Sequence, residues 1–368
     1  MRLGNYIVFD PGGLITRIQV AEARALAIRV LQNAGTPTEF AQAQADLLIF
    51  GELGGHPSHG LLRLPTLISR IRAGLIDPTT AGRHRWPRSA FLSVDGCNGL
   101  GPVVANRALE AASECARQTG IAVAALRRTS HLGMLAPYAE RIALRGQCVI
   151  ATCTSEALVH PWGGRAAMLG TNPLAIGVPA TPHPLVIDMS TGVVSMGKVV
   201  DHARRQVPIP EGWALDERGE PTTDAAAARK GSIAPFGGPK GYALGLALEV
   251  LIATVTGTAL GTAVRGTLDV EHHSTKGDLF VVIDCPELDD AGMTSAPAIV
   301  DVVSQYLQEV RDSPAQHPDH PVSVPGDRST RRREQIDRDG FEIAERTLTE
   351  LNELANYPLD CGVEEATR

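Results

Sequence analysis

The chain lacks several patterns that define large classes of proteins. Its six cysteines include no pair spaced as C-x-x-C, so the usual zinc-binding and redox motifs are absent. The N-terminal stretch MRLGNYIVFDPGG has no basic start followed by a long apolar core, and we do not expect a secretory signal peptide. We therefore expect a cytoplasmic protein whose thiols are small, buried and reduced. The cysteines are Cys97, Cys115, Cys148, Cys153, Cys285 and Cys361.

Positive charge is also in short supply. The formal net charge is -7 at pH 7, which argues against a nucleic-acid partner because binding to phosphates needs a concentrated basic face. One basic run, RSTRRRE from Arg328 to Glu334, is the exception. Such a run is typical of a solvated helix face, and a role in holding a cofactor phosphate is the alternative.

One apolar run is long enough for a membrane-spanning helix. It is YALGLALEVLIATVTGTAL, from Tyr242 to Leu260. Glu249 stands near its centre, however, and the run lacks aromatic belts at its two ends. We expect no membrane partner and instead a helix buried inside a soluble protein.

The 368 residues are enough for two domains, and the first eighty or so favour helices. The second helical segment begins with Thr36, Pro37 and Glu39, which predicts an N-cap, a first helical residue and a capping box. Pro65 predicts a bend in the third segment. The segments with apolar residues at helical spacing are 17–35, 36–50 and 62–77.

The remainder of the chain alternates strand patterns with helix patterns, which predicts a layered α/β domain. The segments typical of strands are 90–96, 120–128, 147–155, 174–180, 184–190 and 277–285. The segments typical of helices are 99–120, a short one after His131, a long one after Gly238, 295–312 and 340–355.

Polar residues cluster where three of these strands end. His131 and Ser155 follow two of them, and Asp188, Met189 and Ser190 close a third. In open parallel α/β sheets, ligands bind just past the carboxyl ends of the strands. Taking the strands as parallel, we expect one cleft edge to hold all three clusters.

His131 has two interpretations. An isolated histidine is often a core residue hydrogen-bonded to a backbone carbonyl, and near neutral pH the same ring can pass a proton in either direction. Gly133 favours the second interpretation, because it thins the backbone where a ligand can approach.

The segment GHPSHGLLR also holds two histidines, His56 and His59. Their H-x-x-H spacing could hold a metal on a regular helix, but Pro57 and the flanking glycines argue against one helix, and no third ligand is evident. The alternative is a turn that presents Ser58 and His59, followed by a helix that presents Arg63, whose guanidinium can clamp a carboxylate. The histidine pairs in EHHS (271–274) and HPDH (317–320) are equally weak as metal sites.

Two glycine-rich segments share features with phosphate-binding loops. DGCNGLG (95–101) lies between a strand and a helix, but its glycine order differs from G-x-G-x-x-G, so it is a weak dinucleotide signal. In PFGGPKGYALG, glycines surround Lys240 at the start of a long helix, where free amides and a full positive charge favour an anion. A helix cap with a solvated lysine is the alternative.

Taken together, these motifs resemble those of one family. The chain is similar to the second, non-Rossmann type of malate/L-lactate dehydrogenase, a family that also includes ureidoglycolate, sulfolactate and diketogulonate oxidoreductases and a cyclic imine reductase. The resemblance covers about residues 20–345 in the family's order. The segments that carry it are GHPSHGLLRLP, VDGCNGLG, TSHLGMLAPYAERIA, PWGGRAAMLGTNPLAIGVP, VIDMSTGVVSMGK, GWALDERGEPTTD, PFGGPKGYALGLALEVL and VPGDR.

The resemblance implies an α/β fold class with two domains. It implies a non-Rossmann NAD(P)-binding α/β domain at 81–295 and a helical domain at 1–80, completed by the C-terminal segment 296–368. It also implies a homodimer, NAD or NADP as the cofactor, and a small carboxylate substrate bound at the cleft between the domains.

The same resemblance assigns roles to individual residues. His131 corresponds to the family's acid/base, and no metal is implied. Pro137 and Tyr138 stand where family members often have two aromatic residues. The residues that match substrate contacts are Ser58, His59 and Arg63. The residues that match cofactor contacts are Ser155, Asp188, Met189, Ser190, Lys240, Gly326, Asp327 and Arg328.

The implied activity is transfer of a hydride between NAD(P)H and a small 2-oxo acid or 2-hydroxy acid. His131 would donate or accept the proton, and Asp188 would steady its tautomer. One alternative keeps the fold and changes the bond, with NADPH-dependent reduction of the C=N bond of a cyclic imino acid. Another is a cofactor-binding protein without turnover.

Overall fold

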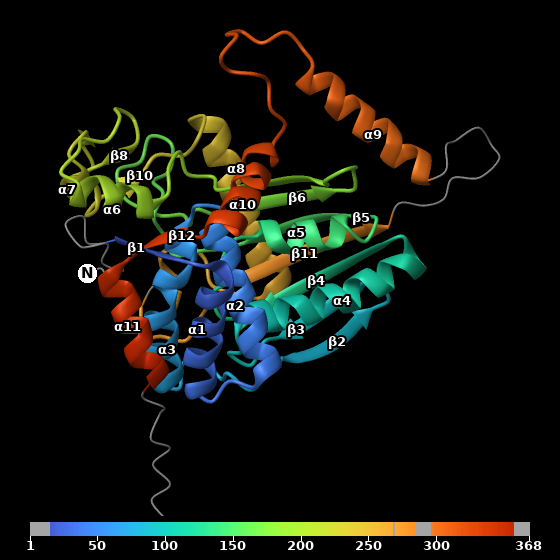
Figure 1. The fold of residues 1–368 in the computed structure, drawn as a ribbon, viewed down its shortest axis with the longest axis horizontal. Coiled ribbons are helices and arrows are strands. Elements are labelled where there is room, and N and C mark those ends of the chain that lie inside the picture. The colour runs from blue at the N-terminus through green and yellow to red at the C-terminus, as the bar shows by residue number, and fades with distance from the viewer. Residues whose placement is uncertain (1–14, 268, 285–295, 357–368) are drawn as a thin grey trace, which may run out of the picture.

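A computed structural model describes residues 15–267, 269–284 and 296–356 (Figure 1). Its centre is a seven-stranded sheet with the order β2-β3-β4-β11-β5-β6-β7. The predictions made for Cys285 and Cys361 fall outside the described residues. The strands are β2 (Arg83–Arg88), β3 (Phe91–Asp95), β4 (Ile121–Arg127), β5 (Gln147–Cys153), β6 (Leu174–Val178), β7 (Leu185–Met189) and β11 (Gly277–Asp284).

The expectation of a parallel sheet is wrong. Only β3 and β4 pair in parallel, and the other neighbouring strands pair antiparallel. The reason is that β11, a late strand, inserts between β4 and β5 and runs opposite to both. Because β6 is antiparallel to both β5 and β7, the strands β4, β5 and β7 nevertheless point the same way. Their carboxyl ends therefore share one edge of the sheet.

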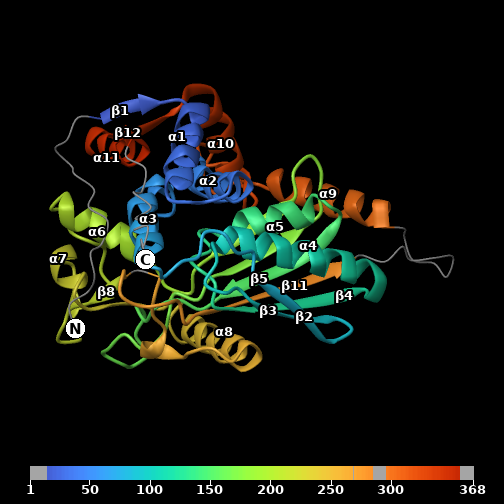
Figure 2. The same ribbon diagram turned by 90° about the horizontal axis from the view of Figure 1, so that it is seen from below.

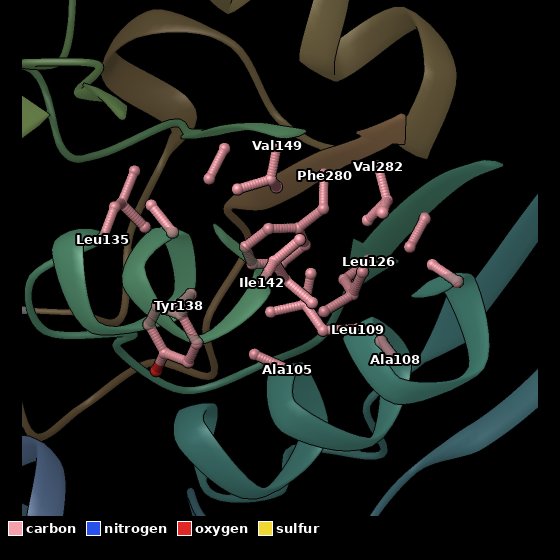
Figure 3. Close-up of a cluster of buried hydrophobic side chains, with 14 of the residues drawn as sticks. Ala105, Ala108, Leu109, Leu126, Leu135, Tyr138, Ile142, Val149, Phe280 and Val282 are labelled. Atoms are coloured by element: carbon pink, nitrogen blue, oxygen red, sulfur yellow. The ribbon is translucent and has the colours of Figure 1, made fainter. Parts of the chain in front are cut away.

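Helices cover both faces of the sheet. The helices α4 (Gly101–Thr119) and α5 (Ala136–Ala143) lie on one face, and α8 (Pro239–Thr256) lies on the other (Figure 2). Figure 3 shows apolar side chains of α4 and α5, among them Leu109 and Ile142, gathered against the sheet residues Val149 and Phe280. This cluster forms the main core beneath the edge where the polar residues were expected.

The long apolar helix α8 is buried on one side only. Glu249, which is 3% exposed, accepts hydrogen bonds there from the backbone N–H groups of Gly170 and Gly261 and from the Asn172 side chain. On the outer side, Leu246, Val250 and Leu251 are exposed, so the expectation of a fully buried helix is wrong. Within the described residues, no helix is long and apolar enough to cross a membrane.

Segments from the two ends of the chain pack together into a helical layer (Figure 1). A short strand from each end pairs antiparallel, β1 (Ile15–Ile18) with β12 (Phe341–Ala344). The helices of this layer are α1 (Val20–Asn33), α2 (Thr38–Leu53), α3 (Leu64–Arg72), α10 (Asp327–Asp339) and α11 (Glu345–Asn356). Two one-turn 3-10 helices, η1 (Pro57–His59) and η2 (Leu61–Arg63), lead into α3.

Three local predictions in this layer are wrong. The residue that caps α2 is Pro37, and the hydroxyl of Thr36 is buried without a hydrogen-bond partner, so the capping box does not form. Pro65 lies in the first turn of α3, where a missing N–H costs nothing, and it bends no helix. The segment 340–355 begins as β12 and not as helix, because pairing with β1 competes with the local helix pattern.

The remaining elements lie around this frame. The helix α9 (Ala296–Arg311) stands apart from the other terminal helices (Figure 1), and Ser304 Oγ accepts a hydrogen bond from the backbone of Thr181, between β6 and β7. A smaller apolar cluster joins helices to a three-stranded sheet. Its elements are α6 (Met196–Arg204), α7 (Ala225–Ala228), β8 (Ala214–Leu215), β9 (Pro221–Thr222) and β10 (Ser232–Ile233). The 3-10 helix η3 (Gly261–Ala263) follows α8.

Candidate active site

A cavity opens where the helical layer meets the edge of the sheet. Its empty volume is about 470 Å³, including the part that opens to solvent. Three of the residues predicted for the site, His59, Arg63 and His131, line it together. The other lining residues are Gln44, Leu47, Leu48, Thr66, Leu67, Arg70, Ser130, Gly133, Gly266 and Thr267.

His131 follows β4 and is held by its own loop. The backbone N–H of Gly133 donates to His131 Nδ1 at 3.0 Å, so in the neutral ring the remaining proton lies on Nε2. Gly101, the first residue of α4, packs against the His131 carbonyl so closely that a Cβ there would clash. The Gly133 hydrogen bond therefore orients the ring of His131, and the close approach of Gly101 positions the backbone that carries it.

The cavity disfavours positive charge on its two histidines. Burial, the nearby Arg63 and the neighbouring His59 hold the pKa of His131 well below its usual range. Burial and Arg63 lower the pKa of His59 to about 3. The two rings stack with their centroids 5.8 Å apart. Both histidines are therefore neutral near pH 7.

Arg63 supplies a positive charge to the cavity. It is half-buried, and across the described residues no hydrogen bond or ion pair engages its guanidinium. Burial is the main reason that its pKa falls to about 10, and the negative charge of Glu156 opposes the change. Arg63 stays charged near pH 7. A half-buried guanidinium without a partner is suited to bind a carboxylate through two parallel hydrogen bonds.

The turn that carries Ser58, His59 and Arg63 is fastened to the end of α2. Glu52 Oε1 accepts the backbone N–H of Leu61 at 2.7 Å. Gly51 makes the close packing possible, because a Cβ at this position would lie 2.7 Å from the carbonyl oxygen of His59. Ser58 Oγ lies 3.3 Å from His59 Nδ1 but does not line the cavity itself.

Asp188 and Ser155, at the ends of β7 and β5, organise the backbone near the site. Asp188 Oδ2 accepts the N–H groups of Leu135 and Ala136 at 2.9 and 2.8 Å, which ties β7 to the start of α5 just past His131. Gly133, and not Asp188, binds His131 Nδ1, so the expectation that Asp188 steadies this ring is wrong. Ser155 Oγ accepts the N–H of Thr171 at 2.9 Å.

The other residues expected to contact a cofactor lie outside the cavity lining. Met189 is 39% exposed at the end of β7, and the Ser190 hydroxyl bonds the backbone of Gly192. Lys240 is exposed in the first turn of α8, where its charge and the free amides favour an anion. These groups offer an apolar surface and a cation, as a dinucleotide requires.

The segment Gly326 to Arg328 starts α10 beside β7. Gly326 has a φ of 100°, and a Cβ there would lie 3.5 Å from the carbonyl oxygen of Val186. Asp327 is engaged by a bidentate ion pair with Arg311 at 3.0 and 2.9 Å, so it shapes the loop and is not free to bind a ligand. Arg328 is exposed, and the basic run that it begins lies on α10, but Arg333 of this run pairs with Glu140 and is only 21% exposed, so the run is not a wholly solvated helix face.

Sequence reasoning missed several polar residues of the site. Gln44 and Arg70 line the cavity from the buried faces of α2 and α3. Beneath it, Lys276, Asp278 and Thr129 form a fully buried hydrogen-bonded cluster. Gln44, Arg70 and Asp278 occupy buried positions of α2, α3 and β11, where the apolar spacing could have indicated them, whereas Thr129 and Lys276 lie outside the helices and strands and follow no such pattern.

The structure also bears on the cysteines and on possible metal ligands. Of the four described cysteines only Cys153 is buried, and the other three are half-buried, so the expectation of uniformly buried thiols is wrong. Over residues 15–267, 269–284 and 296–356, no three His, Cys, Asp or Glu side chains are grouped so that they could hold a metal ion.

Comparisons with known proteins agree with this architecture. The family model described as malate/L-lactate dehydrogenase matches residues 18–352. L-sulfolactate dehydrogenase from Methanocaldococcus jannaschii is 36% identical over 334 residues, which cover 90% of this chain and 94% of that protein. The crystal structure of a dehydrogenase from Sinorhizobium meliloti superposes with a TM-score of 0.87 at 47% identity, covering 93% of this chain and 99% of that one.

Relatives within this family are named for different substrates and cofactors. The (2R)-3-sulfolactate dehydrogenase (NADP(+)) of Chromohalobacter salexigens is 35% identical over 77% of this chain and 85% of its own length. Other names include ureidoglycolate dehydrogenase (NAD(+)) and a Δ1-pyrroline-2-carboxylate/Δ1-piperideine-2-carboxylate reductase. Both NAD(+) and NADP(+) therefore occur as cofactors among the relatives. With a family model covering most of its length and relatives above 30% identity, the chain belongs to the malate/L-lactate dehydrogenase family of NAD(P)-dependent oxidoreductases.

Proposed function

We propose that this protein transfers a hydride between NAD(P)H and a small 2-oxo acid or 2-hydroxy acid, with His131 as the acid/base. The observation that carries the proposal is the meeting of His131 and the unpaired Arg63 in one cavity. Such a substrate has a carboxylate next to the reacting carbon. Arg63 would bind that carboxylate and so hold the reacting oxygen near His131.

The bound nicotinamide supplies or accepts the hydride, and the protein manages the charge on oxygen. In the reductive direction, negative charge grows on the carbonyl oxygen, and the Nε2–H of His131 can donate to it. Net proton transfer needs a second proton on the ring. The substrate carboxylate favours that proton, because it neutralises Arg63, one of the charges that lower the pKa of His131.

The proton on Nδ1 matters in both directions, because the doubly protonated ring needed for reduction carries it as well. To take the proton of a hydroxyl group, Nε2 needs a free lone pair, so the proton of the neutral ring must sit on Nδ1. That tautomer has to give up the hydrogen bond from Gly133. Acid/base work at His131 is therefore coupled to a small movement of the Gly133 backbone.

The two-domain division and the cofactor contacts belong to the same proposal. We assign residues 81–295 to the NAD(P)-binding domain, and 1–80 with 296–368 to the helical domain. The end of β7, Lys240, Gly326 and Arg328 would hold the dinucleotide, because they combine exposed apolar surface with cations and helix N-termini, while Asp327 shapes the loop through Arg311.

We also propose that the protein is a homodimer and that the exposed side of α8 contributes to its interface. Val250 and Leu251 are 47% and 49% exposed there, which is unusual for adjacent large apolar residues on a helix. Sedimentation velocity would give a dimer for the parent and a monomer for Val250→Glu. A monomeric parent protein would refute this part of the proposal.

The test of the activity is loss of turnover at one imidazole. His131→Ala should lower kcat by about 10²- to 10⁴-fold, the usual range for removal of an acid/base, while cofactor binding measured by fluorescence persists. The matched control is His183→Ala, because His183 is exposed and lies outside the cavity. Parent-like turnover by His131→Ala would rule out this role.

A spectrophotometric screen identifies the bond that is reduced and the preferred cofactor. NADH and NADPH are each tested with pyruvate, oxaloacetate, bulkier 2-oxo acids and cyclic imino acids. Oxidation of the cofactor by 2-oxo acids supports the proposal. Oxidation by cyclic imino acids alone would replace C=O reduction with C=N reduction, and cofactor binding without any turnover would refute both.

A further inference from the structure

Gln44 is a buried polar side chain of the cavity whose amide oxygen finds no partner among the described residues. It lies on α2, is 4% exposed, and lines the cavity beside Leu47 and Leu48. Its Oε1 atom is buried and has no hydrogen-bond partner. A buried amide that lacks a hydrogen bond is destabilising, so this arrangement favours a partner from outside the chain.

The position of Gln44 separates it from the reacting end of the cavity. Gly51 of the same helix contacts the His59 carbonyl, and Leu47 lies one turn earlier beside Gly133 of the His131 loop. Gln44 is almost a turn earlier again, with Leu48 next to it on the cavity wall. A substrate held at Arg63 and His131 would therefore direct its tail past these leucines toward Gln44.

The charges around the cavity decide what kind of tail fits. Arg63 and Arg70 line it, and Glu156 and Asp269 are the acidic groups that act on them. Arg70 is already engaged by the carbonyl oxygens of Asp269 and His272. Glu156 accepts two hydrogen bonds from Thr267 at 2.8 and 3.0 Å. Of the two arginines that line the cavity, Arg63 is the one whose guanidinium has no hydrogen-bond or ion-pair partner among the described residues, so it is available to a new anion.

The positive charge of Arg63 therefore matches a substrate with one negative charge, and the cavity offers no match for a second one. A second carboxylate or sulfonate near Gln44 would be desolvated among leucines with no free cation. An uncharged polar tail can form hydrogen bonds with Gln44, because the side-chain amide can donate from Nε2 and accept at Oε1. A purely apolar tail would leave the Gln44 amide unsatisfied.

We propose that Gln44 is a specificity-determining residue and that the substrate is a monoanionic 2-oxo or 2-hydroxy acid whose tail carries an uncharged hydrogen-bonding group, a hydroxyl or a carboxamide. This inference rests on the proposed hydride transfer at His131. It goes further by selecting among the acids that such a site accepts.

Three 2-oxo acids of closely similar shape test the inference. In 2-oxosuccinamate the tail is a carboxamide, in oxaloacetate it is a carboxylate, and in 4-methyl-2-oxopentanoate it is a branched alkyl group. The parent protein should reduce 2-oxosuccinamate with a kcat/KM at least about tenfold above that of the other two, since a site built to hydrogen-bond a substrate rejects analogues that cannot.

Substitution of Gln44 should remove this preference. Gln44→Leu should lower kcat/KM for 2-oxosuccinamate by about 10- to 100-fold, chiefly through KM, because the contact is made in the ground state and the transition state alike. It should leave 4-methyl-2-oxopentanoate unchanged or improved. The matched control is Gln42→Leu, because Gln42 is exposed two residues away on the same helix.

A second variant keeps the size of the side chain in case Gln44→Leu does not fold. Gln44→Glu should lower kcat/KM for oxaloacetate by at least about tenfold relative to the parent, because two carboxylates would then meet in the cavity. Equal ratios among the three acids in the parent and both variants would overturn the role of Gln44. A parent preference for oxaloacetate would overturn the proposed substrate class.

The outcomes also separate this inference from the proposed function. Turnover of all three acids with ratios that ignore Gln44 leaves hydride transfer standing and removes only the specificity role. No oxidation of NADH or NADPH by any of the three acids would overturn both.

Discussion

At the scale of the residue, the site depends on one guanidinium that has no partner in the described part of the chain. Arg63 approaches the cavity from η2, beside two histidines that are neutral near pH 7. An unpaired, partly desolvated charge is costly unless a ligand compensates it. The cost is acceptable here because the same charge both binds a carboxylate and keeps His131 neutral.

Replacing Arg63 by lysine should separate charge from geometry. Arg63→Lys keeps the positive charge but loses the planar fork, so KM for 2-oxo acids should rise about tenfold or more while kcat changes less. Steady-state kinetics of the variant would measure this. Arg72→Lys is the control, because Arg72 is exposed near the end of α3 and lies outside the cavity. An unchanged KM would remove Arg63 from the substrate site.

The lowered pKa of His131 predicts the pH profile of the oxidative reaction. A base must be deprotonated in the free enzyme, and burial with Arg63 nearby keeps His131 deprotonated below its usual range. As pH falls, kcat/KM for a 2-hydroxy acid should therefore stay level through about pH 6.5 and decline only at lower pH. A profile that falls with a midpoint at or above 6.5 would contradict the assignment.

At the scale of the element, α2 carries more of the site than its sequence indicates. Its periodic apolar residues predicted a helix correctly, but periodicity does not tell which neighbour each face meets. The structure shows that one face holds Gln44 and Leu47 against the cavity, while Gly51 and Glu52 fasten the η1–η2 turn. The position of His59 and Arg63 therefore depends on the C-terminal turn of this helix.

Glu52 should make the stability of the protein fall as pH rises. Burial raises its pKa to about 7 from 4.5, although the Leu61 N–H opposes the shift. A carboxyl with a raised folded-state pKa stabilises the fold fully below the unfolded value, and that contribution is lost between about pH 4.5 and 7. A shift of this size corresponds to about 3 kcal/mol.

Chemical denaturation across this pH range would measure the effect. Glu52→Gln keeps an acceptor for Leu61 and cannot ionise, so the loss in free energy of unfolding between pH 5 and 7 should shrink by about 2–3 kcal/mol. Glu39→Gln is the control, because Glu39 is exposed at the other end of α2. If both variants kept the parent's pH dependence, Glu52 would not be its source.

At the scale of the whole molecule, one arginine joins three parts of the chain. Arg333 of α10 forms a bidentate ion pair with Glu140 of α5 at 2.6 and 2.8 Å. Its guanidinium also lies 4.8 Å from the ring centroid of Phe50 on α2. These contacts connect α10 to α2 within the helical layer and to α5, which covers the sheet.

Removal of this connection should loosen the helical layer. Arg333→Ala should lower the free energy of unfolding by about 1–3 kcal/mol, because the Arg333 and Glu140 side chains are only 21% and 23% exposed. A double-mutant cycle with Glu140→Gln would isolate the pair. The control pair, Arg117 and Glu114, is 47% and 64% exposed and should contribute about 0–1 kcal/mol. Equal coupling energies for the two pairs would contradict this account.

Local pattern was enough to predict part of this protein. The helices α1, α4 and α9 and most strands of the central sheet follow from apolar spacing, because that spacing decides which face of a segment can be buried. The same chemistry indicated His131, Ser58, His59 and Arg63 as candidates. The motifs that resemble the family were also a property of the sequence alone, since they need no contacts to be recognised.

Contacts between distant segments decided the rest. The sheet is mixed because β11 inserts between β4 and β5, and β12 is a strand because β1 pairs with it. No local pattern encodes a partner more than a hundred residues away. Gln44 likewise becomes part of a site only when α2 packs beside the His131 loop. The sequence determined which groups are available, and tertiary packing determined which of them meet and which remain without a partner.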